Sequence, residues 1–526
     1  MEEDIEKRKN RLKSKLFSWV NSNYDKLFII ILIAAFFLRL IIFIKTMNQP
    51  LWWDEGDYFA TAKNWGLGLN IGDIWYYRRG FLWALIGAIF FKLDLGEVGI
   101  RFLVLLMSTS IVALSYFVIA KMFNKKTAIL VALGVLLSWV PLFFTGRILT
   151  DIPATFFLLL ALLFFWKGYV LKEGNKFLYL FGVFYALSLL TRFQFAMFAL
   201  PFLVFILLRE KSKIVKNKHL WITLGIMFAI LLPFFVMYWM HYGNIFTDIL
   251  SHYFGVSGVS STTPTPRTAS TLFAYFNDLP YILTKSIFFL FIFGVFFFFL
   301  DMFLGIDKIF KNEEIQKKFF IFLWIITPFL VLGYITQVVE HRYILSTLPF
   351  LFLIASVSIT KIGNWINKRY SNISKKTIFV FSVIILLFLL IVSFGTNFVS
   401  NYSFSNSMIN DKLTSYSEVQ SAGIWMKQNS EPTDIIISES RPQITYYSER
   451  TTYGLGQLSS NETEFEENMS RIKPKYLMLS IFEFHEQWAY AYPTKHNSTM
   501  TPVQAYYRAE KPVVVIYQLN WPYSPT

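Results

Sequence analysis

Cysteine is absent from the sequence. None of the 526 residues is a cysteine, which excludes disulfide bonds, cysteine-bound zinc and a thiol nucleophile. Charged residues are scarce as well, at 16% of the chain, whereas a soluble domain has about 25%. This composition excludes an ordinary soluble enzyme, a disordered chain and a fibrous protein.

Apolar residues are unusually abundant. Hydrophobic residues make up 55% of the chain, phenylalanine alone occurs 58 times, and the mean hydropathy is +0.46. A run of about 20 apolar residues spans a bilayer, and the sequence predicts eleven such spans. They lie at residues 27–44, 102–121, 127–145, 152–166, 177–191, 194–208, 220–240, 281–302, 319–336, 343–360 and 377–396. The predicted fold class is a polytopic α-helical membrane protein.

Lysine and arginine predict the orientation of these spans. The formal net charge is +15, and the segments placed on the inner side hold 27 Lys and Arg, against nine in the outer segments before residue 397. An excess of basic residues marks cytoplasmic loops, so we expect the N-terminus inside. The apolar stretch Phe81–Leu93 has 13 residues, which is too short to span, and should form an interfacial or re-entrant helix.

Three regions follow from this topology. Residues 1–26 form a basic cytoplasmic N-terminus, residues 27–396 a transmembrane domain with a first outer loop at 47–101, and residues 397–526 an extracytoplasmic soluble α/β domain. Within the last region, the pattern predicts a helix over 417–428 and strands over 434–438, 476–481 and 513–519. The expected location is the cell (plasma) membrane, which the chain crosses many times.

Carboxylates stand beside span ends on the predicted outer face. Charge at such positions is costly and points to a site. The first outer loop carries Asp54 and Glu55, and Asp151 follows the third span. A carboxylate there can act as a general base or hold a cation. Two plainer interpretations stay open: a solvated loop for Asp54 and Glu55, and a helix N-cap for Asp151.

Arginines and a histidine lie on the same face. Arginine suits bidentate binding of phosphate. The candidates for binding a phosphate are Arg78, Arg79, Arg192, Arg342 and His341. The candidates for positioning these groups are Tyr58, Arg147 and Glu340. The alternatives are lipid-headgroup contact for Arg78 or Arg79 and an internal ion pair between Glu340 and Arg342.

The sequence does not decide whether the protein binds a divalent metal. Its weak ligand candidates are Glu55 and His252, with His241 in the same long outer loop, although isolated histidines are more often structural or exposed. No organic cofactor is expected. Nucleic acid is not an expected partner, because the basic residues are spread over inner loops instead of forming one patch with aromatic readers.

Four segments resemble a known group of enzymes. They read LWWDEGDYFATAKNW from Leu51, RILTDIPATFFLLLALLFF from Arg147, LTRFQFAMFALP from Leu190 and EHRYILSTLP from Glu340. Together with the tail opening EVQSAGIWMKQNSEPTDIIISESRPQITYYSERTTYG, they resemble the GT-C membrane glycosyltransferases. The similarity is to the dolichyl-phosphate-mannose protein mannosyltransferase and lipid A aminoarabinose transferase group, and it extends loosely over most of the chain.

Two segments depart from that group. Many members have a Lys-Pro-Pro-Leu-like segment before the short helix, where this chain has Tyr77-Arg78-Arg79-Gly80-Phe81-Leu82. Bacterial relatives often have Lys-Gly-Pro where this chain has Arg192-Phe193-Gln194. Because of these departures, the resemblance does not define the sugar or the residues that contact the donor.

The resemblance implies a donor, a mechanism and an acceptor class. A polyprenyl- or dolichyl-phosphate sugar, mannose-like or another hexose or pentose, would enter from the lipid bilayer, and arginines would hold its phosphate. Asp54, which matches the family's first-loop acid, would act as general base on an acceptor hydroxyl that attacks the anomeric carbon with inversion. Glu55 and Asp151 would position groups or hold a cation. The acceptor would be a glycan, a glycolipid or a protein.

Other classes are kept as alternatives. A membrane transporter or flippase of lipid-linked sugars would also carry intramembrane charges, but no inverted repeat is evident. A non-catalytic scaffold leaves the one-sided set of carboxylates and arginines unexplained. Among enzymes, a hydrolase of lipid-linked sugar would use water in place of the acceptor.

Overall fold

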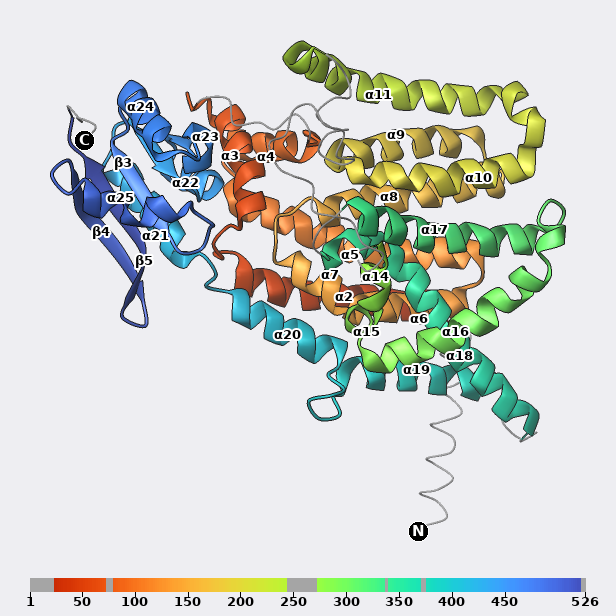
Figure 1. The fold of residues 1–526 in the computed structure, drawn as a ribbon. Helices are drawn as coiled ribbons and strands as arrows, with labels where there is room; N and C mark the ends of the chain where they lie inside the picture. Colours follow the sequence, from red (N-terminus) through yellow and green to blue (C-terminus); the bar gives the residue numbers. More distant parts are fainter. Residues whose placement is uncertain (1–22, 72–78, 244–271, 336–338, 370–374, 522–526) are drawn as a thin grey trace, which may run out of the picture.

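The chain folds into a long helical bundle joined to a smaller unit that contains a β-sheet (Figure 1). The computed structural model describes residues 23–71, 79–243, 272–335, 339–369 and 375–521. The bundle takes up the chain as far as helix α19, and the sheet unit takes up the chain from helix α21 onward.

The bundle is built from the apolar segments expected to span a membrane. Its main helices are α2 (Tyr24–Thr46), α5 (Gly96–Met122), α6 (Lys125–Leu137), α7 (Trp139–Thr145), α8 (Asp151–Phe165), α9 (Asn175–Thr191), α10 (Ala199–Glu210), α11 (Lys218–Tyr242), α16 (Lys285–Leu304), α17 (Glu313–Ile335), α18 (Leu348–Arg369) and α19 (Lys375–Ile391). Between α11 and α16 lie two short helices, α14 (Ala274–Asn277) and α15 (Leu279–Ile282).

These helices confirm the predicted fold class. Among the described residues, eight helical stretches are long and apolar enough to cross a membrane, or nine if the bent pair α6 and α7 forms one span. The two predicted spans outside that count coincide with α9 and α19, which are apolar but shorter. The protein is therefore a multi-span helical membrane protein.

One predicted span is bent. Helices α6 and α7 meet at an angle of 50°. Ser138 between them has a ψ of 132°, which is not helical. In a continuous helix the ring of Pro141 would collide with the carbonyl of Leu137, four residues earlier. Leu137 is the last residue of α6, so the proline explains why the first helix ends there.

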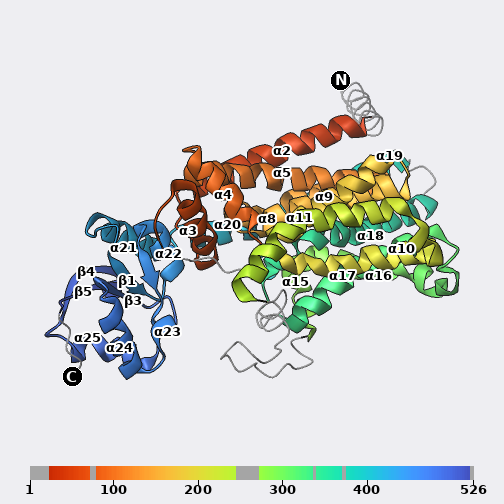
Figure 2. The same ribbon diagram turned by 90° about the horizontal axis from the view of Figure 1, so that it is seen from above.

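Two helices lie between the bundle and the sheet unit (Figure 2). They are α3 (Trp53–Leu67) and α4 (Leu82–Lys92), and α4 is the short helix that the sequence predicts over residues 81–93. The two helices approach closely, because a Cβ on Gly87 of α4 would stand 2.8 Å from the Ala62 Cβ of α3. Glycine at this position permits the contact.

The C-terminal unit is a five-stranded sheet with helices on both faces. Its elements are α21 (Ser417–Gln428), β1 (Ile435–Ser438), α22 (Arg441–Ser448), β2 (Thr451–Tyr453), α23 (Leu455–Leu458), α24 (Glu462–Ile472), β3 (Tyr476–Ser480), α25 (Gln487–Lys495), β4 (Met500–Arg508) and β5 (Lys511–Leu519). The strand order is β2-β1-β3-β5-β4. Strand β1 is parallel to β2 and β3, whereas β5 is antiparallel to β3 and β4.

Alternating side chains divide this unit into two cores. Ile436 of β1 packs with helices α21 and α22, and the next residue, Ile437, packs on the opposite face with α24 and α25. Successive side chains of a strand point to opposite faces. A sheet covered on both faces therefore needs apolar residues at consecutive positions, as the run Ile435–Ile437 has.

The C-terminal unit is docked on the start of the bundle. Helix α22 packs against α3, and Lys63 of α3 pairs with Glu449 at 2.6 Å. The Leu51 N–H donates to the Tyr447 hydroxyl at 2.8 Å, and the Tyr446 hydroxyl donates to a bundle carboxylate, Glu97, at 2.8 Å. These contacts fix the unit against the helix that carries Asp54.

A helix along the bundle precedes this unit. Helix α20 (Asn401–Lys412) packs against α7 and α19. Asn401 is fully buried, and its side-chain amide donates to the Leu283 carbonyl oxygen and to Thr284 Oγ1, both at 3.0 Å. The sheet unit thus follows a helix that is itself hydrogen-bonded to the bundle.

Candidate active site

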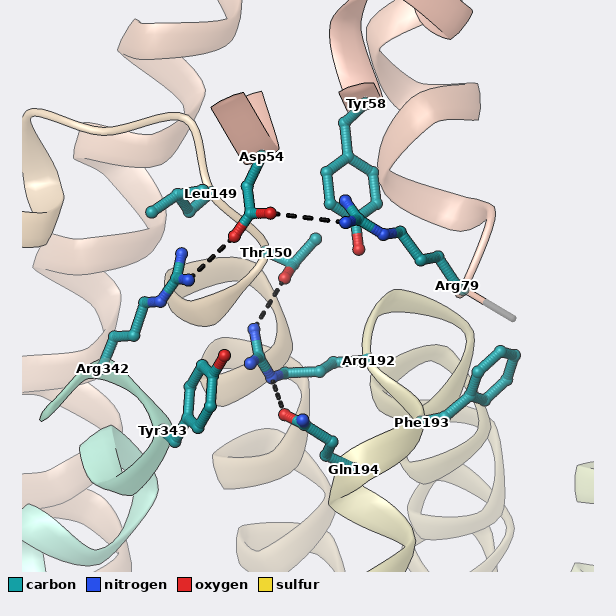
Figure 3. Close-up of a pocket in the computed structure, with 11 residues that line it drawn as sticks. Asp54, Tyr58, Arg79, Leu149, Thr150, Arg192, Phe193, Gln194, Arg342 and Tyr343 are labelled. Atoms are coloured by element: carbon teal, nitrogen blue, oxygen red, sulfur yellow. Dashed lines mark hydrogen bonds and ion pairs between the residues drawn. The ribbon is translucent and has the colours of Figure 1, made fainter. Parts of the chain in front are cut away.

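A polar cavity of about 160 Å³ opens where α3 meets the ends of the bundle helices (Figure 3). It is lined by Asp54, Tyr58, Arg79, Gly80, Leu149, Thr150, Arg192, Phe193, Gln194, Arg342 and Tyr343. Four predicted site residues, Asp54, Arg79, Arg192 and Arg342, meet in it with Tyr58, a predicted positioning residue. The fold therefore gathers residues from distant parts of the sequence into one cavity.

Asp54 is held at the N-terminus of α3. The helix begins at Trp53, and the Glu55 side chain accepts a hydrogen bond from the Trp52 N–H at 2.6 Å. This contact fixes the first turn, where the helix dipole favours negative charge. The Asp54 carboxylate points from that turn into the cavity (Figure 3).

The Asp54 carboxylate bridges two arginines. Its Oδ1 lies 3.3 Å from Arg79 Nη2, and its Oδ2 lies 2.8 Å from Arg342 Nη2. Burial alone raises the pKa of Asp54, but the positive charges of Arg79 and Arg342, with a smaller effect of Arg192, lower it by more. The net pKa lies below its ordinary value. The carboxylate is thus ionised at neutral pH and is a weak base while both arginines hold it.

Arg192 and Arg342 both follow breaks in the helices. Arg192 is extended, with φ −154° and ψ 106°, between α9 and the 3₁₀ turn Phe193–Phe198. Glu340 is extended in the same way before the 3₁₀ turn His341–Thr347. Each of these segments joins two consecutive apolar helices beside the cavity, so a guanidinium group can enter the cavity from the bundle.

Asp151 holds both of these arginines. It is 1% exposed and stands in the first turn of α8. Arg192 Nη1 lies 2.8 Å from one carboxylate oxygen, and Arg342 Nη1 lies 3.9 Å from the other. Neither oxygen accepts a backbone hydrogen bond from the described residues, so helix capping does not account for Asp151. It does not line the cavity but orients two groups that do.

Three further residues around Arg192 were not predicted. Arg192 Nη1 donates to Thr150 Oγ1 at 3.0 Å and its Nε donates to Gln194 Oε1 at 2.8 Å. Its guanidinium lies 4.3 Å from the centre of the Tyr343 ring. A planar guanidinium held by two hydrogen bonds and a ring has little freedom. Gln194 and Tyr343 lie within two residues of predicted arginines, and this proximity is the signal by which the sequence could have indicated them.

Glu55 and Arg147 form a buried pair outside the cavity. Their side chains are 0% and 1% exposed, and Arg147 Nη1 lies 3.3 Å from Glu55 Oε2. Glu55 Oε1 accepts the Ile148 N–H at 2.8 Å, and the Arg147 guanidinium stacks 3.8 Å from the centre of the Trp52 ring. Both oxygens of Glu55 are engaged. The pair joins the start of α3 to the segment before α8.

His341 does not line the cavity either. Its Nε2 contacts the Asp278 carboxylate, and its ring lies 5.3 Å from the Trp139 ring and 4.7 Å from the Tyr281 ring, centre to centre. Successive residues of a 3₁₀ turn point about 120° apart. When Arg342 enters the cavity, the neighbouring imidazole is therefore directed elsewhere.

Glu340 contributes a further carboxylate to Arg342. Its Oε2 lies 3.3 Å from Arg342 Nε. The internal ion pair weighed as an alternative is therefore present. Because Arg342 contacts Asp54 at the same time, that pair does not withdraw the arginine from the cavity.

Two of the metal candidates, Glu55 and His241, lie within the described residues. Arg78 and His252 lie outside the described residues, and His241 stands in the last turn of α11 with its ring against Tyr242. Within the part of the chain that the structure describes, one trio lies close enough to hold a metal ion: Glu462, Glu466 and His496. That trio belongs to the C-terminal unit, and Lys495 already contacts Glu462 at 2.8 Å.

A polar chain leads from the cavity to the C-terminal unit. Arg79 Nη1 lies 3.2 Å from Asp57 Oδ2, and Arg441 Nη2 lies 3.6 Å from Asp57 Oδ1. Asp57 and Arg441 are 6% and 8% exposed. Arg441, which was not predicted, thus reaches a cavity arginine through one carboxylate.

Comparison with known families matches one segment of the chain. Residues 78–239 match the family described as dolichyl-phosphate-mannose-protein mannosyltransferase. The segment includes Arg79, Asp151 and Arg192. No curated protein matches the chain significantly.

Solved structures are similar over most of the chain. ArnT from Cupriavidus metallidurans, bound to undecaprenyl phosphate, is 13% identical with a TM-score of 0.61, covering 94% of this chain and 98% of that one. The Archaeoglobus fulgidus oligosaccharyltransferase in its apo form is 13% identical with a TM-score of 0.63, covering 88% and 70%. The oligosaccharyltransferase AglB from the same organism, with an inhibitory peptide and a dolichol-phosphate, is 14% identical with a TM-score of 0.54, covering 88% and 70%.

The similarity confirms the resemblance found in the sequence. At these identities the structural matches establish a shared fold, and the matched proteins are GT-C glycosyltransferases. The chain has the fold of the GT-C membrane glycosyltransferases and matches the dolichyl-phosphate-mannose-protein mannosyltransferase family over residues 78–239.

Proposed function

We propose that the protein is a glycosyltransferase that moves a sugar from a polyprenyl- or dolichyl-phosphate donor to an acceptor hydroxyl. The observation that carries the proposal is the cavity, in which one carboxylate faces three arginines. Such a transfer requires a base for the acceptor and cations for the donor phosphate. The fold and the family match support it, as do the lipid phosphates in two solved relatives.

The arginines supply the charge that a leaving lipid phosphate needs. Arg79, Arg192 and Arg342 line the cavity. As the bond between sugar and phosphate breaks, negative charge grows on the phosphate, and fixed cations stabilise that charge more than the intact donor. Arg192 is already held by a ring and two hydrogen bonds, so it needs little rearrangement. Removing one such contact costs about 10²–10³ in rate in comparable oxyanion sites.

Asp54 is the proposed base. Its oxygens are held by Arg79 and Arg342. A donor phosphate binds the same two arginines and therefore competes with Asp54 for them. The phosphate charge offsets that of the arginines, so the pKa of Asp54 rises when the donor binds. The carboxylate takes the proton of the acceptor hydroxyl while the hydroxyl oxygen bonds to the anomeric carbon with inversion. The bond from that carbon to the phosphate oxygen breaks, and the lipid phosphate leaves.

The position of the cavity suits an amphipathic substrate, with a polar phosphate group and a lipid chain. Arg192 and Arg342 stand in connections between consecutive apolar helices, where a phosphate can reach them while an isoprenoid chain stays in the bilayer. On the distribution of basic residues, we place this face outside a cell membrane, with the N-terminus in the cytoplasm. The proposed sugar is mannose-like or another hexose or pentose, and the acceptor is a glycan, a glycolipid or a protein.

A transfer assay tests the proposal. Purified protein in detergent receives radiolabelled polyprenyl-phosphate sugars one at a time, with and without an extract of candidate acceptors. Label should pass to an acceptor from one donor, and Asp54→Asn should lower the transfer rate by about 10²-fold or more. Asp94→Asn is the matched control, because Asp94 is an exposed carboxylate of the same predicted loop. Free sugar released without acceptor would replace the proposal by a hydrolase. With the protein reconstituted in vesicles, label that crosses the bilayer still attached to its lipid would replace it by a flippase.

A further inference from the structure

A second small cavity lies in the C-terminal unit, at the carboxyl end of its parallel strands. We call it the sheet-edge crevice. It has a volume of about 70 Å³ and is lined by Glu439, Leu455, Gly456, Ser459, Phe484, His485, Glu486, Trp488 and Ala489. A single water needs about 10–15 Å³ by such a measure. The crevice is therefore large enough for part of a ligand.

The topology of the sheet places this crevice where ligands bind in other α/β proteins. From β1 the chain passes through α22 to β2 on one side, and then through α24 to β3 on the other side of β1. The segments that follow β1 and β3 therefore diverge, and they leave an opening at the carboxyl ends of the two strands. Open α/β sheets bind ligands at such a point. Glu439 directly follows β1, and Phe484 and His485 lie in the segment after β3.

A buried histidine with an unpartnered ring nitrogen lines the crevice. His485 is 5% exposed, and its Nε2 lies 2.7 Å from the Ser480 carbonyl oxygen. A carbonyl can only accept, so Nε2 carries a hydrogen, and the neutral ring then has a lone pair on Nδ1. That Nδ1 has no hydrogen-bond partner among the described residues. A buried polar atom without a partner is costly, so a hydrogen-bond donor that reached Nδ1 from the crevice would be stabilised there.

The other unused groups are acceptors as well. Glu439 Oε2 accepts the Leu455 N–H at 2.8 Å, while no described residue donates to its Oε1. Glu486 adds an exposed carboxylate. Among the described residues that line the crevice, none is lysine or arginine. The crevice thus favours a ligand that donates hydrogen bonds, such as a hydroxyl or an amine, and disfavours phosphates and carboxylates.

An aromatic wall completes the crevice. Phe484 is 85% exposed, although full exposure of such a ring to water is unfavourable. Trp488 is partly buried, packs 4.9 Å from the Phe465 ring and donates its indole N–H to the Ser460 carbonyl oxygen. Its ring is therefore fixed. One exposed and one fixed ring beside acceptor groups suit a ligand that has an apolar face and an edge of hydroxyls, which is the character of a sugar ring.

We propose that the sheet-edge crevice is a second binding site, which takes a neutral or amino sugar by its hydroxyl or amine donors. The bound sugar would be part of the acceptor glycan, a statement that rests on the proposed function. Two residues after Glu439, Arg441 contacts Asp57, the carboxylate that also holds Arg79. The segment after β1, which contributes Glu439 to the crevice, thus also contacts α3 through Arg441.

Ligand-observed NMR on the full-length protein in detergent tests the site. The probes are methyl α-mannoside and glucosamine, with glucuronate as the acidic counterpart. The first two should bind and glucuronate should not. Phe484→Ala and Glu439→Gln should weaken binding about ten-fold, a difference of about 1.4 kcal/mol. Ile481→Ala is the matched control, since Ile481 is 62% exposed in the same segment but does not line the crevice.

A second variant tests the buried acceptor. His485→Gln keeps an N–H donor near the position of Nε2 but removes the Nδ1 lone pair, so it should weaken binding while the thermal unfolding midpoint stays close to that of the wild type. Equal sugar binding by the Phe484→Ala, Glu439→Gln and His485→Gln variants and by wild type, or no binding of either sugar by folded protein, would overturn the proposal.

The two proposals fail separately. Sugar binding in the NMR experiment needs no donor and no turnover. If transfer occurs, Phe484→Ala should raise the KM for acceptor and leave the KM for donor unchanged. Transfer with an unchanged acceptor KM and no sugar binding would reject the crevice alone, whereas binding without transfer by wild type would reject the proposed function alone.

Discussion

At the scale of single residues, charge balance decides what the main cavity can bind. Of the side chains that line it, Arg79, Arg192 and Arg342 are positive and Asp54 is negative. The carboxylates Asp57, Asp151 and Glu340 also pair with these arginines but do not line the cavity. The cavity wall therefore presents more positive than negative charge, which favours an anion. In the proposed mechanism, Asp54 is an internal anion that a donor phosphate displaces from two of the arginines.

This competition predicts two different pH profiles. In the free enzyme the arginines hold the pKa of Asp54 below its ordinary value, so the acid limb of kcat/KM should fall below pH of about 4. In the donor complex the phosphate offsets the arginines, so the acid limb of kcat should lie at higher pH. Both limbs report loss of the ionised carboxylate as pH falls. Steady-state rates between pH 3 and 8 check this, and a kcat limb at or below the kcat/KM limb would contradict it.

A second prediction concerns the buried pair of Glu55 and Arg147. Glu55→Gln removes the charge that compensates Arg147, whose side chain is 1% exposed. Breaking one side of a buried pair costs about 3–5 kcal/mol, so the variant should unfold at a clearly lower temperature. The control is Glu467→Gln, because the Glu467 side chain is 64% exposed. Equal unfolding temperatures for Glu55→Gln and the control would show that the pair does not stabilise the fold.

The sequence located the cavity residues but could not separate them from their neighbours. Charge at a span end is costly, which was reason enough to single out Asp54, Arg192 and Arg342. The same reasoning selected Glu55 and His341, which do not line the cavity. Adjacent residues leave a helical turn in different directions. Which one faces the cavity depends on the residue at which each helix begins, and composition does not define that residue.

At the scale of elements, close helix contacts position the cavity residues. Helix α22 approaches α3 so closely that a Cβ on Gly56 would stand 2.8 Å from the backbone N of Gln443 and from the backbone C of Pro442. Backbone atoms cannot move aside as a flexible side chain can. Gly56 lies between Asp54 and Asp57, so any displacement of α22 is transmitted to the cavity.

Gly56→Ala should therefore lower both stability and turnover. Overpacking of this kind costs about 1–3 kcal/mol, and the displaced helix should weaken the contact between Arg441 and Asp57. Gly225→Ala in α11 is the control, since nothing lies within 4 Å of the Cβ that it would add. That change should be neutral or stabilising by about 0.5–1 kcal/mol. Thermal unfolding and transfer rate check both variants, and identical behaviour of the two would contradict the prediction.

Elements were predictable where apolar length or alternation was strong. The spans and the strands β1, β3 and β5 were found from runs of apolar residues. Strand β2 was missed because it has only three residues, and β4 was missed because much of it is partly or fully exposed. The bend between α6 and α7 was also missed, since Pro141 lies within a continuous apolar run and breaks it by geometry alone.

At the scale of the whole molecule, the C-terminal unit is coupled to the cavity. Arg441 from this unit and Arg79 from the cavity share the carboxylate of Asp57. Pairing between residues this far apart in sequence, 57 and 441, has no signature in a single sequence. The docking of the two units was accordingly beyond prediction, although each unit was expected.

Arg441→Gln should loosen this coupling. Arg79 would keep its contact with Asp54, but Asp57 would lose its partner from the C-terminal unit. Turnover should fall roughly 2- to 30-fold, the range that a coupling of 0.5–2 kcal/mol gives, and amide hydrogen exchange in α3 should become faster. Arg441→Lys should restore part of the rate. Arg471→Gln, with a side chain 74% exposed, is the control, and unchanged exchange in α3 would argue against the coupling.

The central claim is that one cavity holds both the donor phosphate and the base. The most direct measurement compares Asp54→Asn with wild type in two assays on the same folded protein: affinity for polyprenyl phosphate, and turnover. Because Asp54 competes with phosphate for Arg79 and Arg342, the variant should bind lipid phosphate as tightly as wild type or more tightly, while turnover falls by about 10²-fold or more. Weaker lipid-phosphate binding in parallel with lost turnover, or full turnover by the variant, would contradict the account.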